Sequence, residues 1–227
     1  MTTVRLDIIS IGTLARNRLW NESDNLRTAH ATSSLVRAGR SVILVDPGLP
    51  ALALAARLFE RTGLKPSAVD TVFLTTLQSD HRAGLGLFDR ATVYAHEREI
   101  DFFERAMEAE RETAGGDSES QVDRDAEQAL LARLKPAPDE LVAGVGIFPL
   151  FGHTPGTCGL IITTPTMTTI LAGDAVASID HFLAGQVLPD ARNVTEAQSA
   201  FAEVYEIADM IVPGHDNIFP NPRSQGY

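Results

Sequence analysis

Residues 71–84 contain an adjacent carboxylate and imidazole that could hold a metal ion. The stretch begins as an apolar, β-branched run and then breaks into a polar turn that carries Asp80 and His81 side by side. A strand that ends in a loop delivers side chains to one edge of a sheet, and carboxylate with imidazole is a ligand combination that divalent transition metals accept. An Asp-His dipeptide also occurs on surface loops without any metal, so the pair gains weight only from other ligands.

Three later stretches repeat this arrangement, each a strand-like run that ends in a glycine-containing turn with one metal-binding side chain. The three turns are Phe151-Gly152-His153, Ala172-Gly173-Asp174 and Pro213-Gly214-His215. Four strand ends of this kind can converge on one point, and the sequence therefore indicates a metal site.

The order of these motifs resembles that of the metallo-β-lactamase superfamily. The family pattern is a strand with Asp-x-Gly, then His-x-His-x-Asp-His, Gly-His-Thr-Pro-Gly, Gly-Asp and Pro-Gly-His. The corresponding segments here, in the same order, are Asp46-Pro47-Gly48, Thr76-Leu77-Gln78-Ser79-Asp80-His81, Gly152-His153-Thr154-Pro155-Gly156, Gly173-Asp174 and Pro213-Gly214-His215. The resemblance covers almost the whole chain. It implies an α/β (α+β) fold, the four-layer αββα metallo-β-lactamase-like sandwich, with the site at one edge.

The resemblance also implies which residues bind metal. It assigns Asp80, His81 and His215 to one metal site. Asp174 is then the carboxylate that ordinarily bridges two metals. Asp46 is expected to brace the metal loop from behind, as outer carboxylates do for ligands. A second interpretation makes Asp46 a turn former whose carboxylate binds nearby backbone amides.

The chain departs from the family pattern at the first metal site. Thr76 and Gln78 stand where the family has two histidines that, with the position of His153, hold the first of two metals. A hydroxyl or amide oxygen binds zinc weakly. We therefore expect one tightly held divalent metal, zinc in preference to iron or manganese, and a second ion that is weak or absent. His153, released from full ligation, is expected to act as a general base or to stabilise an oxyanion, and Asp80 is assigned with it to the catalytic residues.

Three further residues have alternative interpretations. His30 and His181 could each complete a rearranged metal site or be ordinary loop or core histidines. Cys158 follows Thr157, which stands where many members of the family have another histidine. Its thiol is either buried and inert or a ligand or redox group.

Composition bounds the class of protein. At 227 residues, with 44% hydrophobic and 22% charged residues, the chain fits one domain over residues 1–227. A formal net charge of −11, without a cluster of lysine and arginine, disfavours nucleic acid as a partner. No run approaches the ~20 apolar residues of a membrane span, and the start lacks the pattern of a secretory leader. A single cysteine excludes an internal disulfide, and a cytoplasmic location is the expectation.

Apolar periodicity predicts the elements that position the motifs. Strands are expected over residues 4–11, 32–36, 41–45, 72–75, 92–95, 160–164, 168–172 and 210–212, with a pair of short strands within 141–151. Helices are expected over residues 51–62, 97–112, 124–135 and 194–208. Residues 178–189 are expected to be irregular. The acidic segment 113–123 lies in a helical insertion around 97–135, and it is either a solvated face or a lid or oligomer contact beside the site.

The pattern favours a metal-dependent hydrolase of a small ester, thioester, lactone or phosphodiester. A single metal lowers the pKa of its bound water and so supplies a hydroxide nucleophile. The alternative is a catalytically silent member that keeps the fold as a binding or interaction module, because the ligands of one metal are lost. Oxidoreductase chemistry at a mononuclear iron is disfavoured, because the members that do it rely on the missing histidines. The fold does not fix the substrate, and homo-oligomer formation is left open.

Overall fold

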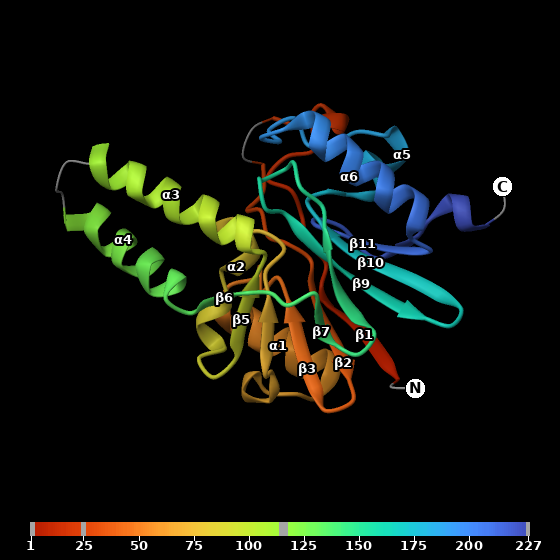
Figure 1. The fold of residues 1–227 in the computed structure, drawn as a ribbon, viewed down its shortest axis with the longest axis horizontal. Coiled ribbons are helices and arrows are strands. Elements are labelled where there is room, and N and C mark those ends of the chain that lie inside the picture. Colours follow the sequence, from red (N-terminus) through yellow and green to blue (C-terminus); the bar gives the residue numbers. More distant parts are fainter. Residues whose placement is uncertain (1–2, 24–25, 114–117, 226–227) are drawn as a thin grey trace.

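Two six-stranded sheets form the centre of the molecule (Figure 1). The computed structural model describes residues 3–23, 26–113 and 118–225. The first sheet has the order β1-β2-β3-β4-β5-β6, with the bounds β1 (Val4–Ser10), β2 (Ser33–Ala38), β3 (Ser41–Val45), β4 (Thr71–Phe73), β5 (Thr92–Ala95) and β6 (Leu134–Pro136). Strands β1 to β3 pair antiparallel, and β3 to β6 pair parallel.

The second sheet has the order β12-β11-β10-β9-β8-β7. Its bounds are β7 (Glu140–Val142), β8 (Val145–Pro149), β9 (Cys158–Thr164), β10 (Met167–Gly173), β11 (Met210–Pro213) and β12 (Phe219–Pro220). All its neighbours pair antiparallel except β10 and β11, which are parallel. Parallel neighbours end at the same edge of a sheet, so the segments that follow β10 and β11 emerge together.

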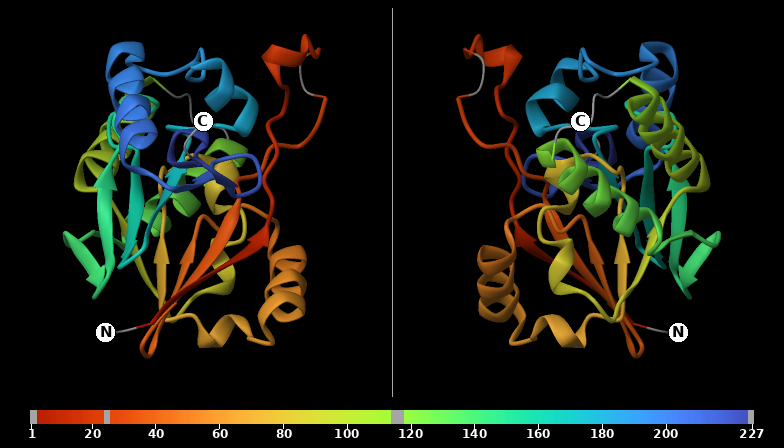
Figure 2. Two further views of the ribbon diagram at one scale, coloured as in Figure 1. Left: turned by 90° about the vertical axis from the view of Figure 1, so that its right-hand side faces the viewer. Right: turned by 90° about the vertical axis from the view of Figure 1, so that its left-hand side faces the viewer.

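The sheets pack face to face, and helices cover their outer faces. Ile43 and Phe73 of the first sheet share one buried cluster with Leu160 and Leu171 of the second. The neighbour of Ile43, Leu44, points to the opposite face, as alternation along a strand requires. Helix α1 (Ala51–Thr62) covers the first sheet and α6 (Val194–Ile207) covers the second, as both views of Figure 2 show. The predicted αββα sandwich is thereby confirmed.

Helix α3 (Glu97–Thr113) and helix α4 (Ser118–Leu131) project side by side away from the two sheets (Figure 1). A contact with the metal-motif segment holds the base of this hairpin. Arg82 donates to Glu127 of α4 at 2.7 Å and to the backbone oxygen of Leu77 at 2.6 Å. Its guanidinium also lies 5.4 Å from the ring centroid of Phe103 in α3. Among the described residues, no helix is both long and apolar enough to pass through a membrane.

Most predicted strands and helices are confirmed, and two predictions are corrected. Residues 178–189 are not wholly irregular, because α5 (Ile179–Ala184) begins at a Ser178 cap and ends at Gly185 in the left-handed region. The helix expected over 124–135 is α4, which begins earlier. Its predicted end is the edge strand β6, which forms by pairing with β5. The segment 113–123 is helical where it is described, and residues 114–117 lie outside the described part.

Candidate metal centre

The motif residues lie just beyond the ends of five strands. Asp46 follows β3, the one-turn helix α2 (Ser79–Arg82) follows β4, and His153 follows β8. Asp174 and His215 follow the parallel strands β10 and β11. The predicted turn at Asp80 and His81 is therefore a short helix. The two sheets face each other, so these ends meet at one edge of the sandwich, as predicted.

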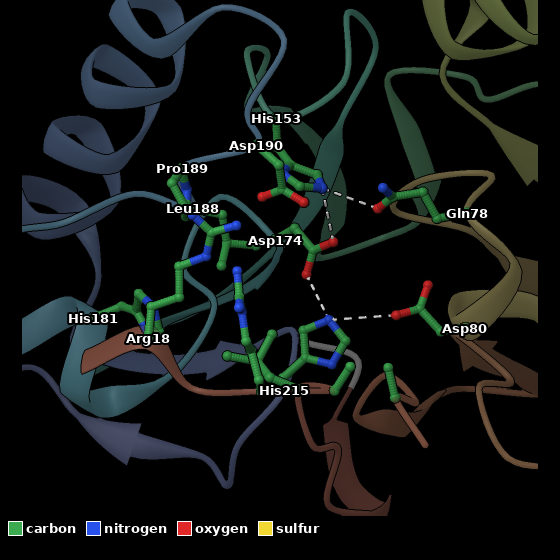
Figure 3. Close-up of a pocket in the computed structure, with 14 residues that line it drawn as sticks. Arg18, Gln78, Asp80, His153, Asp174, His181, Leu188, Pro189, Asp190 and His215 are labelled. Atoms are coloured by element: carbon green, nitrogen blue, oxygen red, sulfur yellow. Dashed lines mark hydrogen bonds and ion pairs between the residues drawn. The ribbon is translucent and has the colours of Figure 1, made fainter. Parts of the chain in front are cut away.

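Asp174 is at the centre of the site (Figure 3). Its Oδ2 atom lies 3.2 Å from Nε2 of His81 and 3.3 Å from Nε2 of His153. Its Oδ1 atom lies 3.0 Å from Nε2 of His215, and that nitrogen lies 3.8 Å from Oδ2 of Asp80. All of these side chains are buried except Asp80, which is half-buried and borders the cavity.

The donor atoms fit a divalent cation. The ligand atoms of Asp80, His81 and His215 lie within 4.8 Å of one another, and Asp174 contacts both histidines. Two imidazoles with carboxylates suit zinc, and they also suit iron or manganese. Among the described residues, this is the group of three or more such side chains that meets the spacing for a metal ion.

The outer nitrogens of His81 and His215 are each fixed by an acceptor. Nδ1 of His81 lies 3.1 Å from Oδ2 of Asp46. The Asp46 carboxylate also accepts from the backbone nitrogen and hydroxyl of Thr75, at 2.8 and 2.7 Å. Nδ1 of His215 lies 3.1 Å from the backbone oxygen of His30. Donation from Nδ1 to these acceptors leaves Nε2 free to bind a cation. Asp46 therefore fits both interpretations of its role.

The carboxylates and histidines of the site stabilise the charged forms of one another. Burial disfavours the charged form of His81, but the charges of Asp174 and Asp46 outweigh burial and raise its pKa well above 6.5. Burial has the same effect on His215, and Asp174 again raises the pKa above 6.5. Burial alone would raise the pKa of Asp174, but the three histidines hold it well below 3.8. The metal-free site thus retains protons that a cation would displace.

The two departures from the family pattern have different surroundings. Gln78 lies at the site, where its Oε1 is 3.0 Å from Nε2 of His153. Thr76 is fully buried, and its hydroxyl donates to Oε1 of Glu99 at 2.8 Å. Thr76 is therefore committed to another carboxylate.

Glu99 is a buried residue that no sequence motif marks. Its side chain accepts from the backbone nitrogen of Leu77 at 2.9 Å and the hydroxyl of Thr154 at 2.6 Å, in addition to Thr76. The Thr154 hydroxyl also lies 2.7 Å from the hydroxyl of Thr157, the residue that stands where many members of the family have another histidine. Glu99 thus ties the segment that carries Gln78 to the segment that carries His153. In the sequence nothing separates it from the exposed acids of the same helix.

A cavity of about 250 Å³ opens over the site. Its floor includes Gln78, Asp80, His153, Asp174 and His215, and its walls include Arg16, Arg18, His181, Leu188, Pro189 and Asp190. A second cavity of about 560 Å³ lies beside Gln78 and His153 and is also lined by Phe102 and Arg192. No sequence motif marks these arginines or Asp190.

The structure places His30, His181 and Cys158, for which the sequence allows alternative interpretations. His30 contributes its backbone oxygen to His215, and its ring lies outside the metal group. His181 lines the cavity, where its Nδ1 lies 2.8 Å from the Ser178 hydroxyl, but it does not join the group of ligand atoms. Cys158 is fully buried between the sheets, and burial raises the pKa of its thiol to about 12. The inert interpretation of Cys158 is the one that its burial supports.

Comparisons with known proteins agree with this geometry. The family model of the metallo-beta-lactamase superfamily matches residues 27–215. No curated protein matches the chain. Among solved structures, a Thermotoga maritima protein assigned as a metallo-beta-lactamase has a TM-score of 0.67 and 18% identity, covering 96% of this chain and 99% of its own.

Two lactonases are also similar in structure. The dizinc quorum-quenching lactonase AidC has a TM-score of 0.64 and 18% identity, covering 82% of this chain and 72% of its own. An N-acyl homoserine lactone hydrolase with a product bound at its catalytic metal centre has a TM-score of 0.64 and 18% identity, covering 94% of this chain and 92% of its own. At these identities the solved structures establish the fold and leave the substrate open.

Proposed function

Because the chain belongs to the metallo-beta-lactamase superfamily, a family of hydrolases, we propose that it hydrolyses a small ester, thioester, lactone or phosphodiester with one tightly bound divalent metal ion. The observation that carries this proposal is the convergence of the inner nitrogens of His81, His153 and His215 on Asp174. The lactonases of the same fold make lactones the first substrates to screen.

The ligands in this proposal are Asp80, His81, Asp174 and His215. Asp46 orients His81 from the far side, and backbone oxygens of the neighbouring loop orient His215. A divalent ion held there supplies a Lewis acid for a carbonyl or phosphoryl oxygen and an activated water as nucleophile. Zinc is the expected ion, with iron and manganese compatible with the same donors.

One ion, and not two, fits the first-site positions. A second tight ion would need three strong donors there, and of the three family positions for that ion, 76, 78 and 153, the last alone carries a histidine. Thr76 is turned to Glu99, and Gln78 offers an amide oxygen that already accepts from His153. Amide and hydroxyl oxygens are weak zinc ligands. We therefore infer that a second ion binds weakly or not at all.

His153 has the position of an acid-base group in this proposal. Its Nε2 atom faces both Gln78 Oε1, at 3.0 Å, and Asp174 Oδ2, at 3.3 Å. These acceptors hold a proton on Nε2 at the floor of the cavity, where it can stabilise charge that develops on a substrate oxygen. The Nδ1 atom is buried and has no hydrogen-bond partner among the described residues.

Metal content tests the proposal most directly. Protein purified without added metal or a metal-binding tag is analysed for its elements, beside Asp80→Ala and His215→Ala. We expect about one zinc, iron or manganese per chain in the parent protein and a large loss in both variants, because each removes a ligand. Absence of metal after reconstitution, or retention in both variants, would refute the assignment. The metal-loaded protein is then assayed with lactones, esters, thioesters and phosphodiesters.

A further inference from the structure

Residues 13–23 and 26–30 form the described part of a loop that borders the cavity and is anchored on a proposed metal ligand. Its ends are joined by two backbone hydrogen bonds between Thr13 and His30, at 2.9 and 3.1 Å. The backbone oxygens of the same two residues lie 3.2 and 3.1 Å from Nδ1 of His215. Figure 2 shows the loop rising beyond the first sheet beside α5. The base of the loop is thus fixed relative to the metal centre.

Hydrogen bonds inside the loop hold the backbone where the 3₁₀ helix η1 (Arg18–Trp20) begins. Asn17 is buried, and its side chain accepts from the backbone nitrogen of Leu19 at 3.0 Å. The backbone nitrogen of Asn17 donates to Glu22 at 2.6 Å. Glu22 in turn pairs with Arg27, whose Nη1 lies 2.9 Å from Oε1. The position of Arg18 is therefore set by the loop and not by its own side-chain contacts.

Arg18 presents an uncommitted cation to the cavity. Its side chain lines the cavity with His153 and Asp174, and Figure 3 shows it reaching toward Leu188 and Pro189. The guanidinium of Arg18 makes no hydrogen bond or ion pair with any residue in the described part of the chain, although Asp190 lines the same cavity. Arg27, by contrast, is committed to Glu22.

The charge around the cavity favours one class of substrate. The chain has a net charge of −11, and Asp80 and Asp174 lie on the cavity floor, where a divalent ion would offset them. Arg18 lines the same cavity, so the cation that an anionic group needs is provided locally. A guanidinium offers a planar pair of donors that matches a carboxylate.

We propose that the substrate carries a carboxylate, which Arg18 binds while the scissile carbonyl lies at the metal centre. This inference rests on the proposed hydrolase function and names its substrate class. One guanidinium, in a cavity that Asp190 also lines, suits a singly charged carboxylate better than a doubly charged phosphate. The two cavities at the site, of about 250 and 560 Å³, both suit a small-molecule substrate.

The test uses two esters that differ by the carboxylate alone. 4-Nitrophenyl hydrogen glutarate and 4-nitrophenyl pentanoate have acyl groups of the same chain length, and only the first is anionic. With the metal-loaded protein we expect a higher kcat/KM for the glutarate. In Arg18→Gln, kcat/KM for the glutarate should fall roughly 10- to 100-fold, mainly through KM, with little change for the pentanoate. Arg18→Lys should restore part of the loss, because a lysine keeps the charge without the planar pair of donors.

Arg61→Gln is the matched control, because it removes the same charge from an exposed position in α1 that lines neither cavity. Equal effects of Arg18→Gln on the two esters, or equal effects of Arg18→Gln and Arg61→Gln, would overturn the inference and leave hydrolysis intact.

If the metal-loaded protein hydrolyses no ester, thioester, lactone or phosphodiester, the proposed function fails and the carboxylate site is tested by binding. The dissociation constant of glutarate is then measured by calorimetry for the parent protein and Arg18→Gln. A weaker constant in the variant supports the site. Equal constants, or no binding to either protein, refute it.

Discussion

At the scale of single residues, a His153 variant can distinguish metal binding from catalysis. Its Nε2 hydrogen-bonds Gln78, and it lies outside the group of ligand atoms formed by Asp80, His81 and His215. We therefore expect His153→Ala to lower kcat by on the order of 10²- to 10⁴-fold, as loss of an acid-base group does, with little change in metal per chain. Activity and elemental analysis of the same preparations check this.

A histidine outside the site provides the control for that experiment. His30 uses its backbone oxygen toward His215, so His30→Ala keeps the contact and should change neither metal content nor turnover. An equal loss of metal and turnover in His153→Ala would show that His153 is a ligand.

Glu99 is a residue whose role lies in stability. It is a buried acceptor for four donors, namely the Thr76 and Thr154 hydroxyls and the backbone nitrogens of Leu77 and Gly156. Glu99→Gln places an amide donor among these donors, and we expect a loss of about 2–4 kcal/mol in the free energy of unfolding. Denaturant titration measures it. Glu97→Gln, an exposed substitution in the same turn, should change stability by less than about 0.5 kcal/mol. Equal effects of the two substitutions would contradict this role for Glu99.

Residues of the site differ in how well the sequence predicts them. Asp80, Asp174 and His215 stand in short ordered motifs, and a motif fixes both residue type and local turn. Glu99 and Arg18 have no motif, and their roles depend on neighbours far along the chain, such as Thr154 or the cavity floor. Pairing across more than fifty residues leaves no local pattern to read.

At the scale of elements, the Gly-His-Thr-Pro-Gly segment is clamped between two helices. A Cβ atom at Gly156 would lie 2.1 Å from the backbone nitrogen of Glu99 in α3. One at Gly152 would lie 2.1 Å from the backbone nitrogen of Ala197 in α6. Backbone cannot yield as a flexible side chain can, so these glycines fix how closely the His153 segment approaches both helices.

Gly156→Ala should therefore destabilise the fold and displace His153. We expect a loss on the order of 1–3 kcal/mol, as for an overpacked core, with a further loss of turnover. Gly86→Ala is the control, because a Cβ there would meet nothing within 4 Å. Thermal unfolding of the two variants compares them, and equal midpoints would contradict the clamp.

The elements that the sequence mispredicts share a physical reason. Strand β6 (Leu134–Pro136) has three residues, too few to show alternation, and it forms by pairing with β5 at the sheet edge. Helix α5 has six residues, too few to show periodicity, although Ser178 and Gly185 mark its ends. Strongly periodic elements such as α1 were predicted with their bounds, because their own burial pattern specifies them.

At the scale of the whole molecule, the protons of the centre link stability to pH. In the metal-free protein the pKa of His81 and His215 is raised above 6.5 by Asp174, which outweighs burial. A raised pKa contributes stability that is complete below 6.5 and is lost as pH rises through the folded value. The pKa of Asp174 is lowered well below 3.8, so its contribution is complete above 3.8 and is lost as pH falls further.

These signs predict opposite pH trends for the metal-free and metal-loaded proteins. Above pH 6.5 the metal-free protein should lose stability, because the unfolded chain releases protons that the folded site still holds. A bound ion has already displaced those protons, so this loss should be absent from the loaded protein. The ion should add more stability as pH rises, because fewer protons compete for the nitrogens. Denaturant midpoints from pH 6 to 9, with and without saturating metal, measure both trends. Parallel curves would mean that the cation does not bind at His81 and His215.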